Sequence, residues 1–150
     1  MRAVIQRVKH AGVMTSSKKS AVIGYGLLIF LGVEHEDTVE DCTWLSSKIA
    51  RLRIFDDNNG VMNLDVVQAG GEIMVISQFT LHAKTRKGNR PSYIRAAPPE
   101  VAVPLYNNFI SDISNETGKE VRTGEFGAKM QVELLNDGPV TIIIDTKSKE

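Results

Sequence analysis

The chain has 150 residues, 42% of them hydrophobic, and its 18 basic and 18 acidic side chains leave no net charge. These values predict a single domain over residues 1–150 with its own hydrophobic core, and they exclude a disordered chain and a globally basic nucleic-acid binder. A polyanionic partner would therefore have to be held by a local patch or by one of its ends.

Several other classes of protein are disfavoured by what the sequence lacks. No apolar run approaches the roughly 20 residues of a membrane helix, and the N-terminus shows no signal-peptide pattern, so we expect a cytoplasmic protein with no membrane partner. The lone Cys42 can form no disulfide within the chain and is most simply a core residue. Because His10, His35 and His82 lack the spacing of a metal-binding helix, we expect neither a metal nor another cofactor.

Apolar runs predict three strands at the start of the chain. Residues 2–8 alternate between apolar and polar, and residues 21–23 form a short strand after a polar turn at 15–20. Residues 27–33 are continuously apolar, which is typical of a strand buried on both faces.

Two helices are expected. Asp37 followed by Glu40 is typical of a capping box, so the first helix should begin there and run to about Arg53. The second is predicted over residues 99–116, where Pro104 favours a late start or a kink. The first helix would bury a stripe made of Val39, Cys42, Leu45, Ile49 and Leu52.

Three further strands complete the pattern. After an exposed turn at 56–60, a strand is predicted over 72–79, and two alternating strands over 130–136 and 140–145 flank a turn at 137–139. Together these elements indicate an α+β fold, in which a strand-rich, mixed or antiparallel, barrel-like sheet carries two main helices.

The first candidate site is the motif Ser77-Gln78-Phe79-Thr80-Leu81, which follows a buried apolar run and precedes a basic loop. Ser77 and Thr80 offer hydroxyls, Gln78 offers an amide, and backbone N–H groups at a strand end can stabilise the oxyanion of an acyl transfer. The alternative is a strand edge with ordinary hydrogen-bonded polar residues, and five residues alone do not decide between the two.

The second candidate is Asn136-Asp137-Gly138-Pro139. Asn, Asp and Gly between alternating strands are typical of a hairpin turn. Proline directly after glycine is less ordinary, because it removes a backbone donor near the ladder and because an X-Pro bond can be cis. On these residues alone, a plain surface turn and a functional one both stay open.

Charge is distributed unevenly beside the first motif. No acidic residue occurs between Glu72 and Glu100. Such a stretch would suit a phosphate backbone, and the alternative is a solvated loop that is balanced by acids elsewhere in space. The basic residues of this window are Lys84, Arg86, Lys87, Arg90 and Arg95.

Two further features bear on chemistry. Thr80 and His82 are two residues apart, so an extended segment would place both on one side as a nucleophile and its base. Arg7, inside the first strand, needs an acceptor, either a carboxylate or the carbonyls of a neighbouring loop.

The motifs at 77–81 and 136–141 together resemble those of the D-aminoacyl-tRNA deacylase family. Supporting stretches are MRAVIQRV at the start, GLLIFLGVEHED at 26–37 and RKGNRPSYIRAAPPE at 86–100, so the similarity covers nearly the whole chain in order. It implies an enzyme that hydrolyses the ester bond of D-aminoacyl-tRNA, and of glycine mischarged on the alanine tRNA, in proofreading for translation. L-aminoacyl-tRNA would be rejected.

The resemblance also implies a homodimer with shared sites. The Gly138-Pro139 peptide would be cis and would enter the partner's active site, opposite a wall formed by Ser77, Gln78, Phe79 and Thr80. Backbone N–H groups of Phe79 and Thr80 would stabilise the oxyanion, assisted by the ribose 2′-hydroxyl or a water. Arg7 would clamp the Gly-Pro loop, Phe126, Met130 and Asn136 would support the pocket, and Lys84, Arg86, Lys87 and Arg90 would contact tRNA.

Three rival interpretations remain. They are a paralogous tRNA deacylase with a trans Gly-Pro peptide, a non-catalytic RNA-binding dimer, and an unrelated small hydrolase that uses Thr80 and His82. The intact motifs favour the deacylase. The chain departs from the family pattern at Gly12, Val61 and Lys84, none of which lies in either motif.

Overall fold

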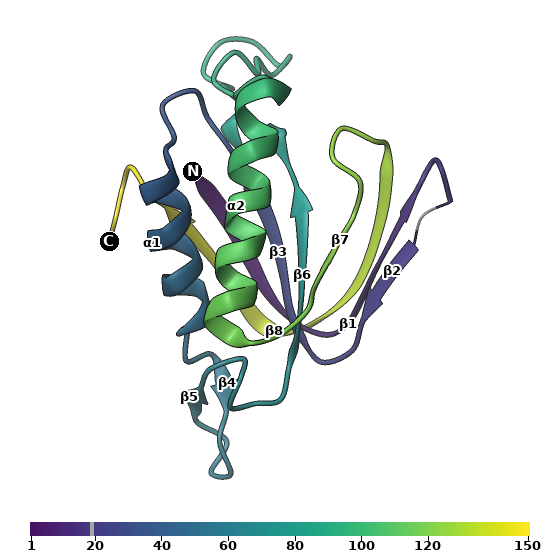
Figure 1. The fold of residues 1–150 in the computed structure, drawn as a ribbon, viewed down its shortest axis with the longest axis vertical. Helices are drawn as coiled ribbons and strands as arrows, with labels where there is room; N and C mark the ends of the chain where they lie inside the picture. The colour runs from purple at the N-terminus through teal and green to yellow at the C-terminus, as the bar shows by residue number, and fades with distance from the viewer. Residues whose placement is uncertain (19) are drawn as a thin grey trace.

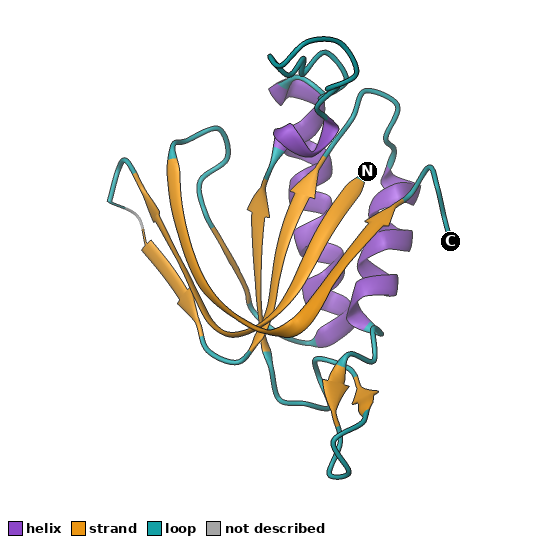
Figure 2. Cartoon of the chain, turned by 180° about the vertical axis from the view of Figure 1, so that it is seen from behind, coloured by secondary structure: helices purple, strands orange, loops and turns teal. Residues whose placement is uncertain are grey.

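The computed structural model describes residues 1–18 and 20–150 and shows two neighbouring helices against one face of a strongly curved sheet (Figures 1 and 2). This arrangement confirms the predicted α+β class, with a barrel-like mixed sheet and two main helices. In chain order the elements are β1 (Arg2–Thr15), β2 (Ser20–Ile23), β3 (Gly26–Gly32), α1 (Val39–Ala50), β4 (Phe55–Asp56), β5 (Met62–Leu64), β6 (Glu72–Ser77), the 3₁₀ helix η1 (Phe79–His82), α2 (Pro99–Thr117), β7 (Val121–Thr123) and β8 (Met130–Asp145).

β1 organises the sheet, because three other strands pair with it. Residues 2–8 of β1 pair antiparallel with β3, residues 11–14 pair antiparallel with β2, and β8 follows the opposite edge over both halves. β3 and β6 are parallel, as are β6 and β7. The sheet curves until β2 lies against β6 and β7, which gives the barrel-like form visible in Figure 2.

β3 and β6 are apolar on both faces because each face of the sheet carries a core. Leu27 and Ile29 belong to the larger core beneath the helices, whereas Leu28, Met74 and Ile76 belong to a second core inside the curve. Successive side chains of a strand point to opposite faces, so a strand between two cores reads as a continuous apolar run. The run predicted as a buried strand is therefore confirmed as β3.

The C-terminal hairpin predicted around residues 137–139 is wrong. Residues on both sides of this segment pair with the same strand, β1, so β8 continues through it as one strand. Between the pairs Gln6–Thr141 and Val8–Asn136, the single residue Arg7 faces the four residues 137–140. Those four residues therefore form a bulge that projects from the sheet.

The helices differ from the prediction in three places: the N-cap of α1, the end of α1 at Ala50 rather than at about Arg53, and the uninterrupted start of α2. Thr38, not Asp37, is the N-cap of α1, and its N–H donates to the Asp41 carboxylate at 2.9 Å. Asp37 instead binds the N-terminal ammonium group. α2 begins at its first predicted residue despite Pro104, whose missing N–H leaves the carbonyl of the exposed residue Glu100 without its helical donor.

Other local predictions were incomplete. The strand predicted over 72–79 ends at Ser77, and the chain then turns into η1. The short strands β4, β5 and β7 were not predicted, because two or three residues carry too little periodicity to be recognised. The predicted turn at 15–20 includes Lys19, which lies outside the described residues.

Candidate active site

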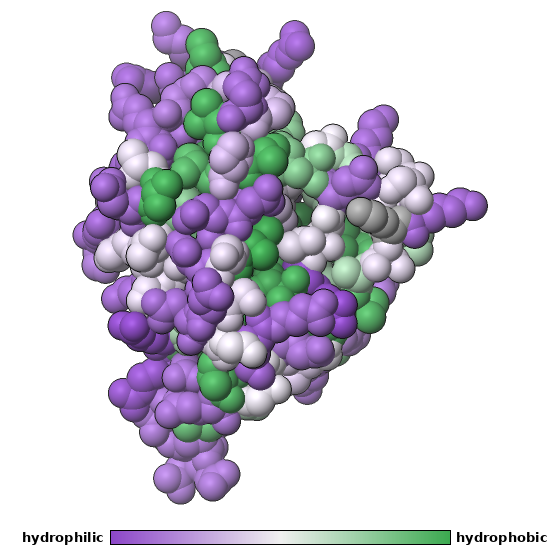
Figure 3. All heavy atoms as spheres, in the orientation of Figure 1, coloured by the Kyte–Doolittle hydropathy of each residue, from purple (hydrophilic) through white to green (hydrophobic). Residues whose placement is uncertain are grey.

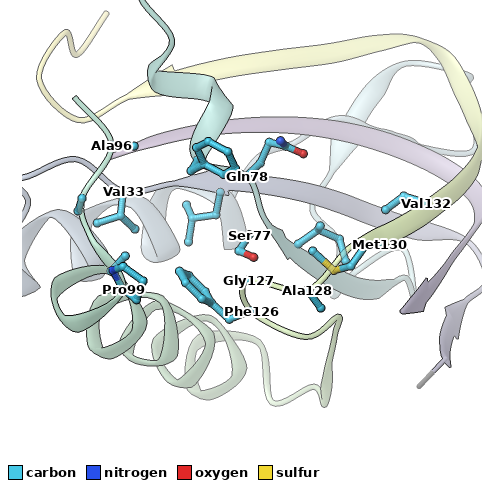
Figure 4. Close-up of a pocket in the computed structure, with 15 residues that line it drawn as sticks. Val33, Ser77, Gln78, Ala96, Pro99, Phe126, Gly127, Ala128, Met130 and Val132 are labelled. Carbon is cyan, nitrogen blue, oxygen red and sulfur yellow. The ribbon is translucent and has the colours of Figure 1, made fainter. Parts of the chain in front are cut away.

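A cleft of about 430 Å³ opens between the end of β6, the start of α2 and the segment that leads into β8 (Figure 4). In Figure 3 the surface beside α2 is hollowed, and hydrophobic side chains surround the hollow. The lining is mostly apolar, and its polar side chains are those of Ser77 and Gln78. The main lining residues are Val33, Ser77, Gln78, Phe79, Ala96, Ala97, Pro99, Phe126, Gly127, Ala128, Met130 and Val132.

The first predicted motif forms one wall of this cleft. β6 ends at Ser77, and the Gln78 N–H still donates to the Leu31 carbonyl at 2.8 Å, which holds the turn against β3. The Gln78 amide donates to the Thr80 hydroxyl at 2.5 Å. Phe79 and Thr80 open a 3₁₀ helix, so their N–H groups have no acceptor within the described part of the chain.

The pairing of Thr80 with His82 that an extended segment would permit is not formed. The segment is a 3₁₀ helix rather than an extended chain, so residues two apart do not share a side. The His82 ring is buried, packs against Gly32 and lies with Nδ1 3.9 Å from a Glu34 carboxylate oxygen. The Thr80 hydroxyl is bonded to Gln78 instead, and His82 supplies no base to it.

Phe126 and Met130 both line the cleft, where they were expected (Figure 4). The Phe126 ring meets Tyr106 of α2 edge to face, with the centroids 5.6 Å apart. Tyr106 in turn donates its hydroxyl to the Val75 carbonyl at 2.9 Å, and burial raises the pKa of Tyr106 well above its usual value. Phe126 is therefore held by a neutral, buried partner that is anchored to β6.

Sequence analysis missed the small residues of the cleft. Ala96 and Ala97 line the cleft ahead of α2, and Gly127 and Ala128 line it in the segment before β8. Their contribution is the space they leave, together with backbone groups that can approach a ligand closely. Small residues carry no chemical pattern, and the only signal in the sequence was their presence within stretches that resemble the family.

The second predicted motif is the bulge of β8. The Gly138–Pro139 peptide is cis, and both residues are exposed. Asn136 closes the base of the bulge, since its amide donates to the carbonyls of Arg7 and Val140, each at 3.1 Å. The two exposed residues thus stand on a fixed base.

Arg7 holds the bulge from the other side. Its Nε donates to the Asp137 carbonyl at 3.0 Å, and its Nη1 donates to the Ile54 carbonyl at 2.7 Å. The side chain is 7% exposed and also lies 3.1 Å from the Asp56 carboxylate. The acceptors that a strand arginine requires are therefore both carbonyls and carboxylates: the carbonyls of Asp137 and Ile54, and the carboxylates of Asp56 and Asp137, the last 3.0 Å from Nε.

The two motifs are not brought together within one chain. Gly138 and Pro139 are absent from the lining of the cleft, which β8 reaches only through Met130 and Val132. Eight residues of strand separate Met130 from Gly138, a span of roughly 25 Å. A Gly138-Pro139 tip that contacts a Ser77–Phe79 wall would have to come from a second copy of the chain.

The four residues predicted to contact tRNA, Lys84, Arg86, Lys87 and Arg90, are all exposed and lie between η1 and α2. Backbone hydrogen bonds between Lys84 and Ser92, at 2.8 and 3.0 Å, close the loop that carries them.

Among the described residues, no cluster of His, Cys, Asp or Glu is arranged to hold a metal ion. Within the same part of the chain, no helix is both long and apolar enough to cross a membrane.

A concave, mostly apolar cleft with a few converging polar groups is the usual form of a small-substrate site in an enzyme. The unbonded N–H groups beside it are of the kind that stabilises a developing oxyanion. Fold and site together therefore define a small α+β enzyme domain.

The family model described as D-Tyr-tRNA(Tyr) deacylase matches residues 4–145, and the chain belongs to that family of hydrolases. A D-aminoacyl-tRNA deacylase of Bacteroides thetaiotaomicron is 61% identical over 150 residues, which is the full length of both chains. The solved structure of a c-Myc DNA unwinding element binding protein superposes with a TM-score of 0.90 at 38% identity, covering 97% of this chain and 99% of that one. A second structure, titled as a probable eukaryotic D-amino acid tRNA deacylase, shares the fold with a TM-score of 0.82 at 15% identity, covering 95% and 97%.

Proposed function

We propose that this protein is a D-aminoacyl-tRNA deacylase, which hydrolyses the ester between a D-amino acid and the 3′ end of tRNA. Its membership of the deacylase family carries the proposal, since relatives of that name match from end to end. The mostly apolar cleft of about 430 Å³ is the site proposed for the esterified end of such a substrate, and the exposed basic loop would suit its phosphates. The enzyme would act in the cytoplasm, where tRNAs are charged, as a proofreading step of translation.

Selection by handedness would depend on the Gly138-Pro139 tip of a second subunit. The enzyme must accept amino acids with many different side chains but with only one configuration at Cα. A pocket that binds the side chain itself cannot meet both requirements. A rigid main chain close to the substrate Cα instead excludes the L side chain by collision. The contacts of Arg7 and Asn136 at the base of the tip supply this rigidity. Glycine on the alanine tRNA has no side chain to exclude, so it would be hydrolysed as well.

For the chemistry we propose positioning and polarisation of the ester rather than covalent catalysis. The N–H groups of Phe79 and Thr80 would stabilise the oxyanion, while the ribose 2′-hydroxyl or a water would assist the attack. Ser77 and Gln78 would hold the shape of this wall. The contact from Gln78 to the Thr80 hydroxyl favours a structural role for that hydroxyl.

The proposal predicts a large chiral preference. Purified protein should hydrolyse D-tyrosyl-tRNA at least about 100-fold faster than L-tyrosyl-tRNA, which corresponds to a difference of about 2.7 kcal/mol in activation free energy. Single-turnover assays with matched substrates measure this ratio, with uncatalysed hydrolysis as the blank. Equal rates for the two substrates would rule out the proposal. No hydrolysis above the blank would also rule it out and would leave the non-catalytic RNA-binding dimer.

The chemistry predicts that the activity of Thr80→Ala stays within about tenfold of the wild type, because one hydrogen bond of the wall is lost while the backbone donors remain. Removal of an obligatory nucleophile typically costs on the order of 10⁶-fold. Thr80→Ser, which retains the hydroxyl, is the matched control. A loss of several orders of magnitude in Thr80→Ala that Thr80→Ser restores would instead establish covalent catalysis.

A further inference from the structure

We infer that the exposed Tyr93 ring is a stacking platform for the unpaired nucleotides that precede the esterified nucleotide at the tRNA 3′ end. This inference rests on the proposed function, because it concerns the part of that substrate which extends beyond the cleft. Tyr93 lies outside both site motifs, so this binding role is additional to those of the motif residues.

An aromatic surface leads out of the cleft. Phe79 lines the cleft, yet its side chain is 56% exposed, and its ring meets Tyr93 edge to face with the centroids 5.1 Å apart. Tyr93 is 41% exposed and the adjoining Ile94 71% exposed. Large apolar side chains are normally buried, so a contiguous exposed group beside a cleft marks a binding surface.

Backbone hydrogen bonds and an ion pair hold the chain in place on both sides of Tyr93. On one side of Tyr93, the backbone of Ser92 bonds to that of Lys84. On the other, Arg95 donates to the Glu34 carboxylate at 3.2 Å, and Glu34 is buried at the end of β3. The Tyr93 carbonyl also accepts the Ala96 N–H at 3.0 Å. A ring on such a support loses little conformational freedom when a ligand binds, which favours affinity.

The charge around the platform indicates which ligand it fits. The window between Glu72 and Glu100 has basic residues and no acidic ones, and its basic side chains Lys84, Arg86, Lys87 and Arg90 are exposed. A single-stranded nucleic acid carries both flat rings and regularly spaced negative charge. Its unpaired bases stack on aromatic side chains. The 3′ end of a tRNA is such a strand, and the ester to be cleaved lies at its last nucleotide.

The test compares two substrates that differ only in this strand: D-tyrosyl-tRNA, and D-tyrosine esterified to adenosine alone. Loss of the aromatic ring on which a base stacks weakens binding by about tenfold, so Tyr93→Ala should lower kcat/KM for the tRNA substrate about tenfold, mainly through KM. The adenosine ester should be hydrolysed within about twofold of the wild-type rate. Tyr93→Phe should restore the tRNA activity, whereas Tyr93→Leu, which is apolar but has no flat ring, should not.

Several results would overturn the inference. They include equal losses on both substrates, full activity of Tyr93→Leu on tRNA, and a Tyr93→Ala protein that elutes at a smaller assembly mass than the wild type, which would make the ring a subunit contact. If the wild-type protein prefers D- over L-tyrosyl-tRNA as expected, but Tyr93→Ala leaves kcat/KM for the tRNA substrate unchanged, this inference alone would be overturned. A wild-type protein without that preference would overturn the proposed function and this inference with it.

Discussion

Replacement of Arg7 by methionine is expected to lower the deacylase activity at least about 100-fold and the free energy of unfolding by about 2–3 kcal/mol. The guanidinium donates to the carbonyls of Asp137 and Ile54 from a nearly buried position, so the substitution leaves both acceptors without their donor. Each buried polar group that loses its partner costs about 1–3 kcal/mol. The activity should fall further than stability alone explains, because the Gly138-Pro139 tip loses one of its two supports and a displacement of about 1 Å at an active site can cost 100-fold.

Urea unfolding monitored by circular dichroism measures the first effect, and single-turnover hydrolysis of D-tyrosyl-tRNA measures the second. Arg51→Met is the matched control, since Arg51 is 73% exposed and forms a surface ion pair with Glu116 at 3.3 Å. Surface pairs of this kind contribute at most about 1 kcal/mol, so the control should retain its activity. An Arg7→Met protein that keeps full activity while losing stability would show that Arg7 supports the fold and not the tip.

Gly26→Ala is expected to prevent folding, or to destabilise the protein by more than about 4 kcal/mol. Gly26 opens β3 and is the register partner of Glu72 in β6. A Cβ at position 26 would lie 1.9 Å from the Glu72 carbonyl oxygen and 2.6 Å from its nitrogen, which are backbone atoms that cannot move without separating the two strands. Such a loss is a large share of the roughly 5–15 kcal/mol by which a domain of this size is stable.

Thermal unfolding and the yield of soluble protein measure this effect. Gly12→Ala is the control in the same sheet, because a Cβ there would meet the flexible Glu133 side chain at 3.3 Å and the Val22 side chain at 3.5 Å. Both neighbours can adjust, so the unfolding midpoint of the control should stay within a few degrees of the wild type. A Gly26→Ala protein with a similar midpoint would contradict the strand spacing described here.

Much of the fold was predictable because it follows from local periodicity. The continuous apolar run that became β3 and the stripe of Cys42, Leu45 and Ile49 on α1 can be buried only as a two-sided strand and as a one-sided helix. Both assignments needed only the spacing of apolar residues. The candidate site was predictable in a different way, since Ser77–Thr80 and Gly138-Pro139 were recognised as motifs of a family before any geometry was known.

The tertiary structure decided what local patterns leave open. Asn, Asp, Gly and Pro suit a hairpin turn and a strand bulge equally well, and the length of β1, which pairs with both ends of β8, selected the bulge. The same pairing placed Arg7 opposite residues 137–140. The cleft was likewise unpredictable, because its walls come from segments far apart in the sequence and several of its residues are alanine or glycine. Sequence by itself therefore determined the longer, strongly patterned elements and the family, through spacing and motif, whereas which elements meet depends on long-range packing that no local pattern records.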